Sequence, residues 1–217
     1  MRRTAGFTLI EILVVVAIIA AILGGISLMI AQATRARTKL AATGQVTSLG
    51  AAIERLHEPD QLGMYPPTRL EMLIGPGSMA AIGKKLGNGG NDTNCGIEAV
   101  YVAVRLKGVN VTVEGFEGEE SIKNLDDDKA NEAAPGMASA ELFEYIDQWN
   151  NPIVYINSRD YKDMKKVERY VLGSGQEVKV APRTLANGEF ARPTTFQLFS
   201  MGPDGVPGTE DDIHYGQ

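Results

Sequence analysis

Hydrophobic residues form one long, uninterrupted segment near the start of the chain. No polar side chain occurs from Ile12 to Ile26, and the apolar segment as a whole covers residues 7–31. A helix of about 25 residues is roughly 37 Å long, which is sufficient to cross a bilayer. We therefore predict a transmembrane helix over residues 7–31, following a short basic segment over residues 1–6.

The helical pattern continues beyond the apolar segment, but there it is one-sided. From Val46 to Leu56, apolar side chains recur at the spacing of one helix face. Pro59 cannot lie inside a helix, because it lacks a backbone N–H. We expect an amphipathic continuation of the helix over residues 32–58, with its apolar face packed against a sheet.

The remaining residues, 59–217, have the mixed pattern of a globular domain with short strands. Alternating apolar and polar residues predict a strand over Thr195–Ser200, and the apolar run Ile153–Ile156 predicts another. Residues 98–106 fit a helix by one spacing and a strand by another, and we favour the helix.

The composition of the chain argues against two broad classes of function. Its 217 residues carry a formal net charge of −6, whereas nucleic-acid phosphates require a basic protein face. Only two histidines occur, no Ser-His-Asp order suggests a catalytic triad, and no glycine-rich phosphate loop follows a strand. We therefore expect neither nucleic-acid binding nor enzymatic activity. The single cysteine, Cys95, cannot form an intrachain disulfide.

One carboxylate lies inside the apolar segment. Glu11 costs several kcal/mol in hydrocarbon unless it is paired, so it is a candidate functional residue. A secretory signal would have a shorter apolar core followed by its cleavage site, and a plain membrane anchor leaves Glu11 unexplained. An interfacial amphipathic helix does not fit either, because the segment has no polar face.

The six residues Gly6 to Glu11, Gly-Phe-Thr-Leu-Ile-Glu, lie directly behind the basic segment. They resemble the class III signal of type IV pilins and of the pseudopilins of type II secretion. The resemblance implies that a prepilin peptidase cleaves between Gly6 and Phe7 and that the new Phe7 amine is methylated. It also implies that Glu11 pairs with the Phe7 ammonium of a neighbouring subunit and fixes the axial register of a filament.

Two segments of the globular domain, residues 59–217, are similar to the major pseudopilin of type II secretion. One is Tyr65-Pro-Pro-Thr68 with a short helix after it, and the other is the turn Asp147–Pro152 that precedes the predicted strand. The fold implied is α+β, with a long N-terminal helix packed on a small antiparallel sheet, as in type IV pilins. Residues 75–140 are least like this family, and we interpret them as a surface insertion.

Three adjacent carboxylates, Asp126–Asp128, lie within this predicted insertion. They lack the glycine turn and the alternating spacing of a metal-binding loop. We interpret them as a solvated acidic loop.

The C-terminal loop, residues 201–213, combines carboxylate and hydroxyl side chains with three glycines. Such hard oxygen ligands, drawn from side chains and backbone carbonyls, suit calcium. On the residues alone, a calcium site and a simple polar turn are equally open. His214, which follows the loop, is expected at the surface and not as a ligand.

The same loop closely resembles the C-terminal calcium loop of the major pseudopilin. The resemblance implies five ligands, through side-chain or carbonyl oxygens: Met201, Asp204, Val206, Thr209 and Asp211. Asp212 is a rival to Asp211, because the register of the loop cannot be fixed from the sequence.

Taken together, the resemblance implies a structural subunit of a type II secretion pseudopilus, stabilised by calcium. The chain would cross the bacterial inner membrane once, with Arg2 and Arg3 keeping the N-terminus cytoplasmic and the head in the periplasm. The implied partners are copies of itself, prepilin peptidase, the inner-membrane assembly platform, minor pseudopilins and membrane lipid. A type IV pilin or minor pilin of a surface fibre, for adhesion, motility or DNA uptake, remains the alternative.

Overall fold

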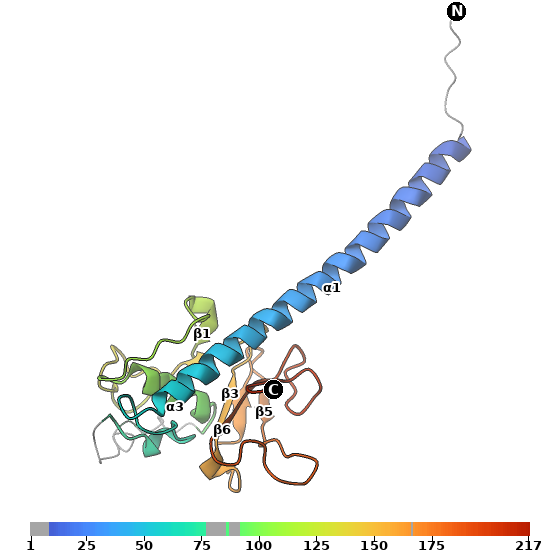
Figure 1. Cartoon of the computed structure of the whole chain (residues 1–217). Helices are drawn as coiled ribbons and strands as arrows, with labels where there is room; N and C mark the ends of the chain where they lie inside the picture. The colour runs from blue at the N-terminus through green and yellow to red at the C-terminus, as the bar shows by residue number, and fades with distance from the viewer. Residues whose placement is uncertain (1–8, 77–85, 87–91, 166) are drawn as a thin grey trace, which may run out of the picture. The chain divides into compact units, whose positions relative to one another are not determined.

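A computed structural model of the chain describes residues 9–76, 86, 92–165 and 167–217. It contains two compact units, Met1–Leu40 and Ala41–Gln217, and we refer to the second as the head. Helix α1 covers Leu9–Leu56, so its residues belong to both units (Figure 1). It ends before Pro59, as predicted from the missing N–H of that residue.

In the first unit, α1 presents apolar side chains to solvent. The large apolar side chains described there, from Leu9 to Ile30, are 48–84% exposed. Among the described residues, no helix has both the length and the apolar character needed to span a membrane.

In the head, the same helix buries one face. The predicted apolar stripe is confirmed, because Val46, Leu49, Ile53 and Leu56 are all at most 1% exposed. Gly50 lies on the same part of the helix, where the ring of Tyr215 occupies the place that a Cβ would need. Tyr215, close to the C-terminus, therefore packs directly against α1 at Gly50.

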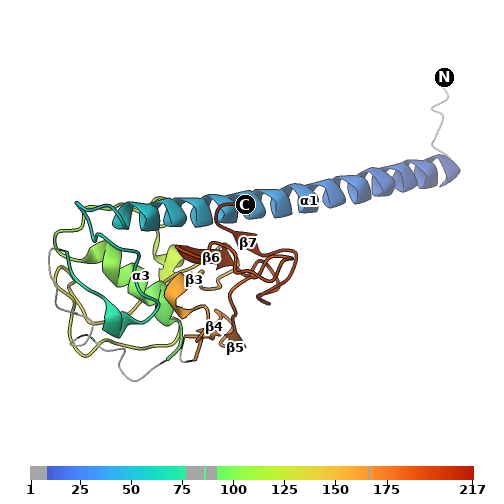
Figure 2. The same ribbon diagram turned by 60° about the horizontal axis from the view of Figure 1, so that its bottom comes forward.

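The sheets of the head are small and antiparallel. The largest has the order β3-β6-β7, formed by Val154–Asn157, Phe196–Ser200 and Ile213–His214. Tyr155 pairs with Leu198 across β3 and β6, and Phe199 pairs with His214 across β6 and β7. Figure 2 shows the three strands of this sheet. The predicted α+β class is therefore confirmed, and the two strands predicted from the sequence pair with each other.

Two further sheets have two strands each. Strand β1, Ile122–Lys123, pairs with β2, Glu144–Tyr145, and strand β4, Arg169–Val171, pairs with β5, Glu177–Lys179. The described residues also form three 3₁₀ helices: η1 Leu70–Met72, η2 Glu119–Ser121 and η3 Ser158–Asp160.

The segment before η1 is bonded directly to β3. The hydroxyl of Tyr155 and the side-chain amide of Asn157 both donate to the carbonyl of Pro66, at 2.6 and 2.9 Å. The Asn157 N–H donates to the hydroxyl of Thr68 at 2.9 Å. These three bonds hold the Tyr-Pro-Pro-Thr turn against β3, directly before η1.

Helix α3, Cys95–Arg105, confirms the helical interpretation of this region. The prediction that residues 75–140 lie at the surface is wrong here, because every residue from Cys95 to Ala103 is buried. Gly96 brings α3 against β3, and apolar residues of the following loop, such as Phe116, join the same core. A helix covered in this way is part of the core, not an addition to it.

Candidate functional site

The N-terminal processing site falls partly outside the described residues. Gly6 and Phe7 lie outside them, so their cleavage and the pairing of Glu11 with Phe7 remain predictions. Glu11 lies in the first turn of α1 and is exposed. A carboxylate is favourable there, because the first turn of a helix carries unpaired N–H groups and a partial positive charge.

The C-terminal loop connects β6 to β7 and brings three of the five predicted ligands together. The Thr209 hydroxyl lies 2.5 Å from Asp211 Oδ1 and 3.1 Å from the carbonyl oxygen of Val206. Two side-chain oxygens and one backbone oxygen therefore converge in this loop. Met201, the residue directly after β6, is buried, and Gly202, with φ of +65°, turns the chain immediately after it.

The remaining predicted ligand, Asp204, is exposed, and its Oδ1 accepts a hydrogen bond from the Val206 N–H at 2.8 Å. Asp212 faces inward, where its Oδ2 accepts from the Gly208 N–H at 2.8 Å. Burial raises the pKa of Asp212 to about 6, and the negative charges of Asp211 and Asp204 add to the rise. The charges of Asp211 and Asp204 thus disfavour the ionised form of Asp212, an effect that a bound cation would relieve.

His214 does not lie at the surface as predicted. It belongs to β7, its side chain is only 16% exposed, and its ring packs against Phe199 with centroids 5.0 Å apart. Burial lowers the pKa of His214 to about 4, and the charge of Arg183 lowers it further. The sequence could not show this, because β7 has only two residues and depends on pairing with β6.

The loop is anchored to the turn after β2. Ser200 donates to Asp147 Oδ2 at 2.5 Å, and Asp147 Oδ1 accepts from the N–H groups of Trp149 and Asn151, both at 2.9 Å. The Asn151 amide donates to the carbonyl of Gly202 at 3.3 Å. The turn Asp147–Pro152 therefore holds the start of the C-terminal loop in place.

A second group of carboxylates, which the sequence did not predict, lies inside the head. We define the buried acidic group as Glu98, Asp126, Asp128 and Glu144. The prediction of a solvated acidic loop is wrong at Asp128, which is 8% exposed, and at the half-buried Asp126. It holds only at Asp127. One feature of the sequence could have indicated this group: Glu98 is a lone carboxylate within the apolar run of α3.

Comparison with known proteins bears on the first part of the chain. Residues 1–27 match the family profile described as a prokaryotic N-terminal methylation motif. No curated protein and no solved structure was found to match the chain. The motif indicates a type IV pilin-like prepilin, which is processed by prepilin peptidase, anchored in a membrane and polymerised into a pilus or pseudopilus. The α+β head is consistent with this assignment.

Proposed function

We propose that this type IV pilin-like prepilin is a structural, non-enzymatic subunit of a type II secretion pseudopilus. The match of residues 1–27 to the methylation motif carries the prepilin part of this proposal, because it contains the cleavage pair Gly6-Phe7. The oxygen-rich C-terminal loop, residues 201–213, carries the choice of a pseudopilus. The mature chain is anchored in the inner membrane, with its head in the periplasm. It polymerises on an inner-membrane assembly platform together with minor pseudopilins, and the growing filament drives protein export.

The exposed apolar side chains of α1 support assembly through the N-terminal helix. Removing one large aliphatic side chain from water contributes about 1.5–3 kcal/mol, and the large apolar side chains that the structure describes between Leu9 and Ile30 are exposed. Lipid covers them before assembly, and neighbouring helices cover them in the filament. Both environments have the low polarity that makes Glu11 costly unless it is paired.

Pairing between Glu11 and the Phe7 ammonium of another subunit neutralises both charges and fixes the axial register. Substituting Glu11→Gln keeps the size of the side chain but removes its charge. We expect the variant to be cleaved after Gly6 but to form filaments at least about tenfold less efficiently, since a broken buried pair leaves one charge uncompensated. The exposed Glu114→Gln is the matched control. Normal filament yield from the Glu11 variant would exclude the pairing.

The C-terminal loop is proposed to bind one calcium ion. The convergence of oxygens from Thr209, Asp211 and Val206 supports this site. The repulsion of the Asp212 carboxylate by Asp211 and Asp204 supports it as well. The binding stoichiometry of the full chain in detergent can be measured by calorimetry. We expect Asp204→Ala to lower it by about one equivalent, while the exposed Glu210→Ala leaves it unchanged. If Asp204→Ala and Glu210→Ala bound the same number of calcium ions, the C-terminal loop would not be a calcium site.

The ligand at the end of the loop is tested with two more variants. Asp211 contacts the Thr209 hydroxyl, whereas Asp212 accepts from the Gly208 N–H. Loss of binding in Asp211→Ala but not in Asp212→Ala would support the ligand set proposed here. The reverse result would assign the position to Asp212.

A surface fibre is the competing assignment, because the methylation motif fits pilins and pseudopilins alike. The oxygen-rich C-terminal loop supports the pseudopilus, and so does the single cysteine, which leaves no C-terminal disulfide. Deleting the gene in its native bacterium separates the two. Loss of exported proteins from the medium with intact surface fibres supports the pseudopilus, whereas loss of fibres with normal export overturns it.

A further inference from the structure

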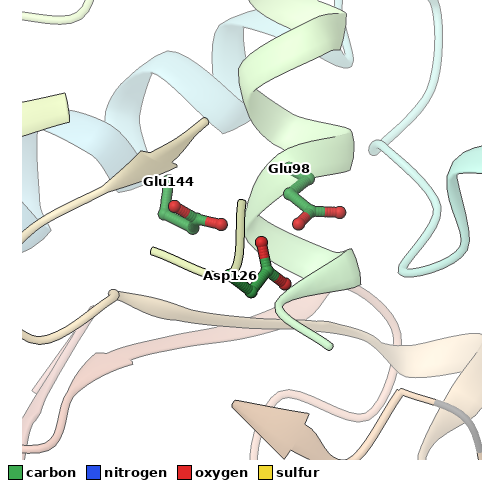
Figure 3. A group of neighbouring side chains, drawn as sticks. All are labelled: Glu98, Asp126 and Glu144. Carbon is green, nitrogen blue, oxygen red and sulfur yellow. The ribbon is translucent and has the colours of Figure 1, made fainter. Parts of the chain in front are cut away.

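The buried acidic group draws four carboxylates from three parts of the head. Glu98 lies on α3, Glu144 lies in β2, and Asp126 and Asp128 lie in the loop between β1 and β2. Figure 3 shows Glu98, Asp126 and Glu144. Oxygen atoms of Glu98, Asp126 and Glu144 all lie within 4.8 Å of one another. The three side chains point toward a common space.

Glu98 is the least compensated member of the group. It is 0% exposed, and neither of its carboxylate oxygens accepts a hydrogen bond from a donor among the described residues. Both oxygens of Asp128, which is 8% exposed, are in the same situation. A carboxylate buried without donors costs several kcal/mol, so these groups must be neutralised by a proton or by a cation.

Glu144, in contrast, is held in a fixed orientation. Its Oε1 accepts from the Asn94 amide at 3.1 Å, and its Oε2 accepts from the Leu125 N–H at 2.9 Å. The Asn94 amide is itself oriented, because its oxygen accepts from the Val171 N–H at 2.9 Å. This support from outside the group resembles the way in which metal ligands are usually positioned.

The loop that carries the two aspartates is also closed by a side chain. Asn124 accepts from the Asp128 N–H at 3.1 Å and donates to the Asp128 carbonyl at 2.8 Å. Asp127, with φ of +57°, lies at the turn and points to solvent. The alternation that results places Asp126 and Asp128 inward, on either side of one exposed residue.

We propose that the buried acidic group binds one calcium ion, separate from the calcium of the C-terminal loop. Two oxygens on one calcium ion lie about 2.3–2.6 Å from it and therefore at most about 5 Å apart, which the three converging carboxylates satisfy. Zinc prefers nitrogen and sulfur ligands, and no histidine or cysteine of the described residues joins the group. Magnesium requires a stricter octahedral arrangement, whereas calcium accepts irregular sets of carboxylates.

Protonation is the physical competitor of the cation. Burial raises the pKa of Glu144 to about 8 and that of Asp128 to about 7, and the charge of Asp126 adds to both shifts. Burial also raises the pKa of Glu98 well above its usual range, with Asp128 and Glu144 adding to the effect. Calcium would displace these protons and connect α3 to the β1–β2 loop through shared ligands.

The experiment uses the full chain in detergent, with calcium titrated by calorimetry and the melting temperature followed in parallel. The background is Asp204→Ala with Asp211→Ala, which removes two proposed ligands of the C-terminal loop. We expect this background to retain about one equivalent of calcium. Adding Glu98→Gln should then weaken the binding at least about tenfold, since losing even an outer partner of a metal ligand commonly costs about 10–100-fold.

Without calcium, Glu98→Gln is not expected to destabilise the head. The amide has the size of the acid but no charge, so the calcium-free variant should melt at or above the temperature of the parent chain. Glu120→Gln is the matched control, because that side chain is 93% exposed and lies next to β1. It should change neither the calcium affinity nor the melting temperature.

Each outcome bears on one of the two calcium sites. A folded Asp204/Asp211 double variant that binds no calcium would overturn the buried site and leave the C-terminal loop intact as a proposal. Binding of about one equivalent by both the parent chain and the double variant would keep the buried site and reject the loop. If the double variant does not fold, Glu98→Gln and Glu144→Gln are compared with the parent chain, and unchanged stoichiometry in both overturns the buried site.

Discussion

Replacing Gly96 with alanine should destabilise the head, although alanine is the better helix former. A Cβ at this position would lie 2.1 Å from the carbonyl oxygen of Tyr155, whereas ordinary contacts begin at 3.4 Å. Helix α3 and strand β3 would therefore have to separate by about 1 Å. The Tyr170 hydroxyl, which donates to the same carbonyl at 3.1 Å, lies only 2.9 Å from the added Cβ.

The expected cost follows from these contacts. Overpacking of this kind costs about 1–3 kcal/mol, and weakening the Tyr170 hydrogen bond adds about 0.5–1.5 kcal/mol. Alanine returns about 1 kcal/mol through its helix propensity. The free energy of unfolding should therefore fall by about 0.5–3.5 kcal/mol, which lowers the melting temperature by roughly 1–14 °C for a domain of this size.

The assay is thermal and urea unfolding of the full chain in detergent, followed by near-ultraviolet circular dichroism of its aromatic residues. Gly44→Ala is the matched control, because Gly44 lies in α1 of the head and a Cβ there meets nothing within 4 Å. It should stabilise the head by about 0.4–1 kcal/mol. If Gly96→Ala were as stable as the parent chain while Gly44→Ala behaved as expected, the close packing of α3 on β3 would be refuted.

Two other substitutions test the packing of the head and the support of its loop. Leu49→Ala should lower the free energy of unfolding by about 2–5 kcal/mol, because Leu49 is 0% exposed. The control Leu40→Ala, at a position that is 73% exposed, should lower it by at most about 0.5 kcal/mol. Equal melting temperatures of these two variants would contradict the packing of α1 in the head. Ser200→Ala removes the buried donor to Asp147, so the unfolding free energy should fall by about 1–3 kcal/mol and calcium binding by the C-terminal loop should weaken. Unchanged melting and calcium affinity in this variant would show that the turn at Asp147 does not support the loop.

Local patterns in the sequence predicted the elements that depend on neighbouring residues. The apolar stripe that ends at Leu56 and the stop before Pro59 are properties of one helix, and both are present. The strands at Ile153–Ile156 and Thr195–Ser200 have enough residues to show their character, and they correspond to β3 and β6. Strand β7 has only two residues, so its existence depends on β6 and no local pattern indicates it.

The carboxylates of the C-terminal loop and those of the buried acidic group differ in how far apart they lie in the sequence. The C-terminal loop is continuous in sequence, so Val206, Thr209 and Asp211 could be predicted to lie together. The buried acidic group joins residues as far apart as Glu98 and Glu144, and its burial depends on how α3 packs. A run such as Asp126–Asp128 looks solvated in the sequence, because nothing local indicates that two of its three side chains turn inward.

The assignment as a prepilin is tested most directly at the N-terminus of the mature chain. The full chain is expressed with and without a prepilin peptidase, and its N-terminal peptide is identified by mass spectrometry. We predict that the peptidase yields a chain that begins at Phe7 with one methyl group on its amine, and that no cleavage occurs without the peptidase. A chain that keeps Gly6 in the presence of an active peptidase would contradict the account.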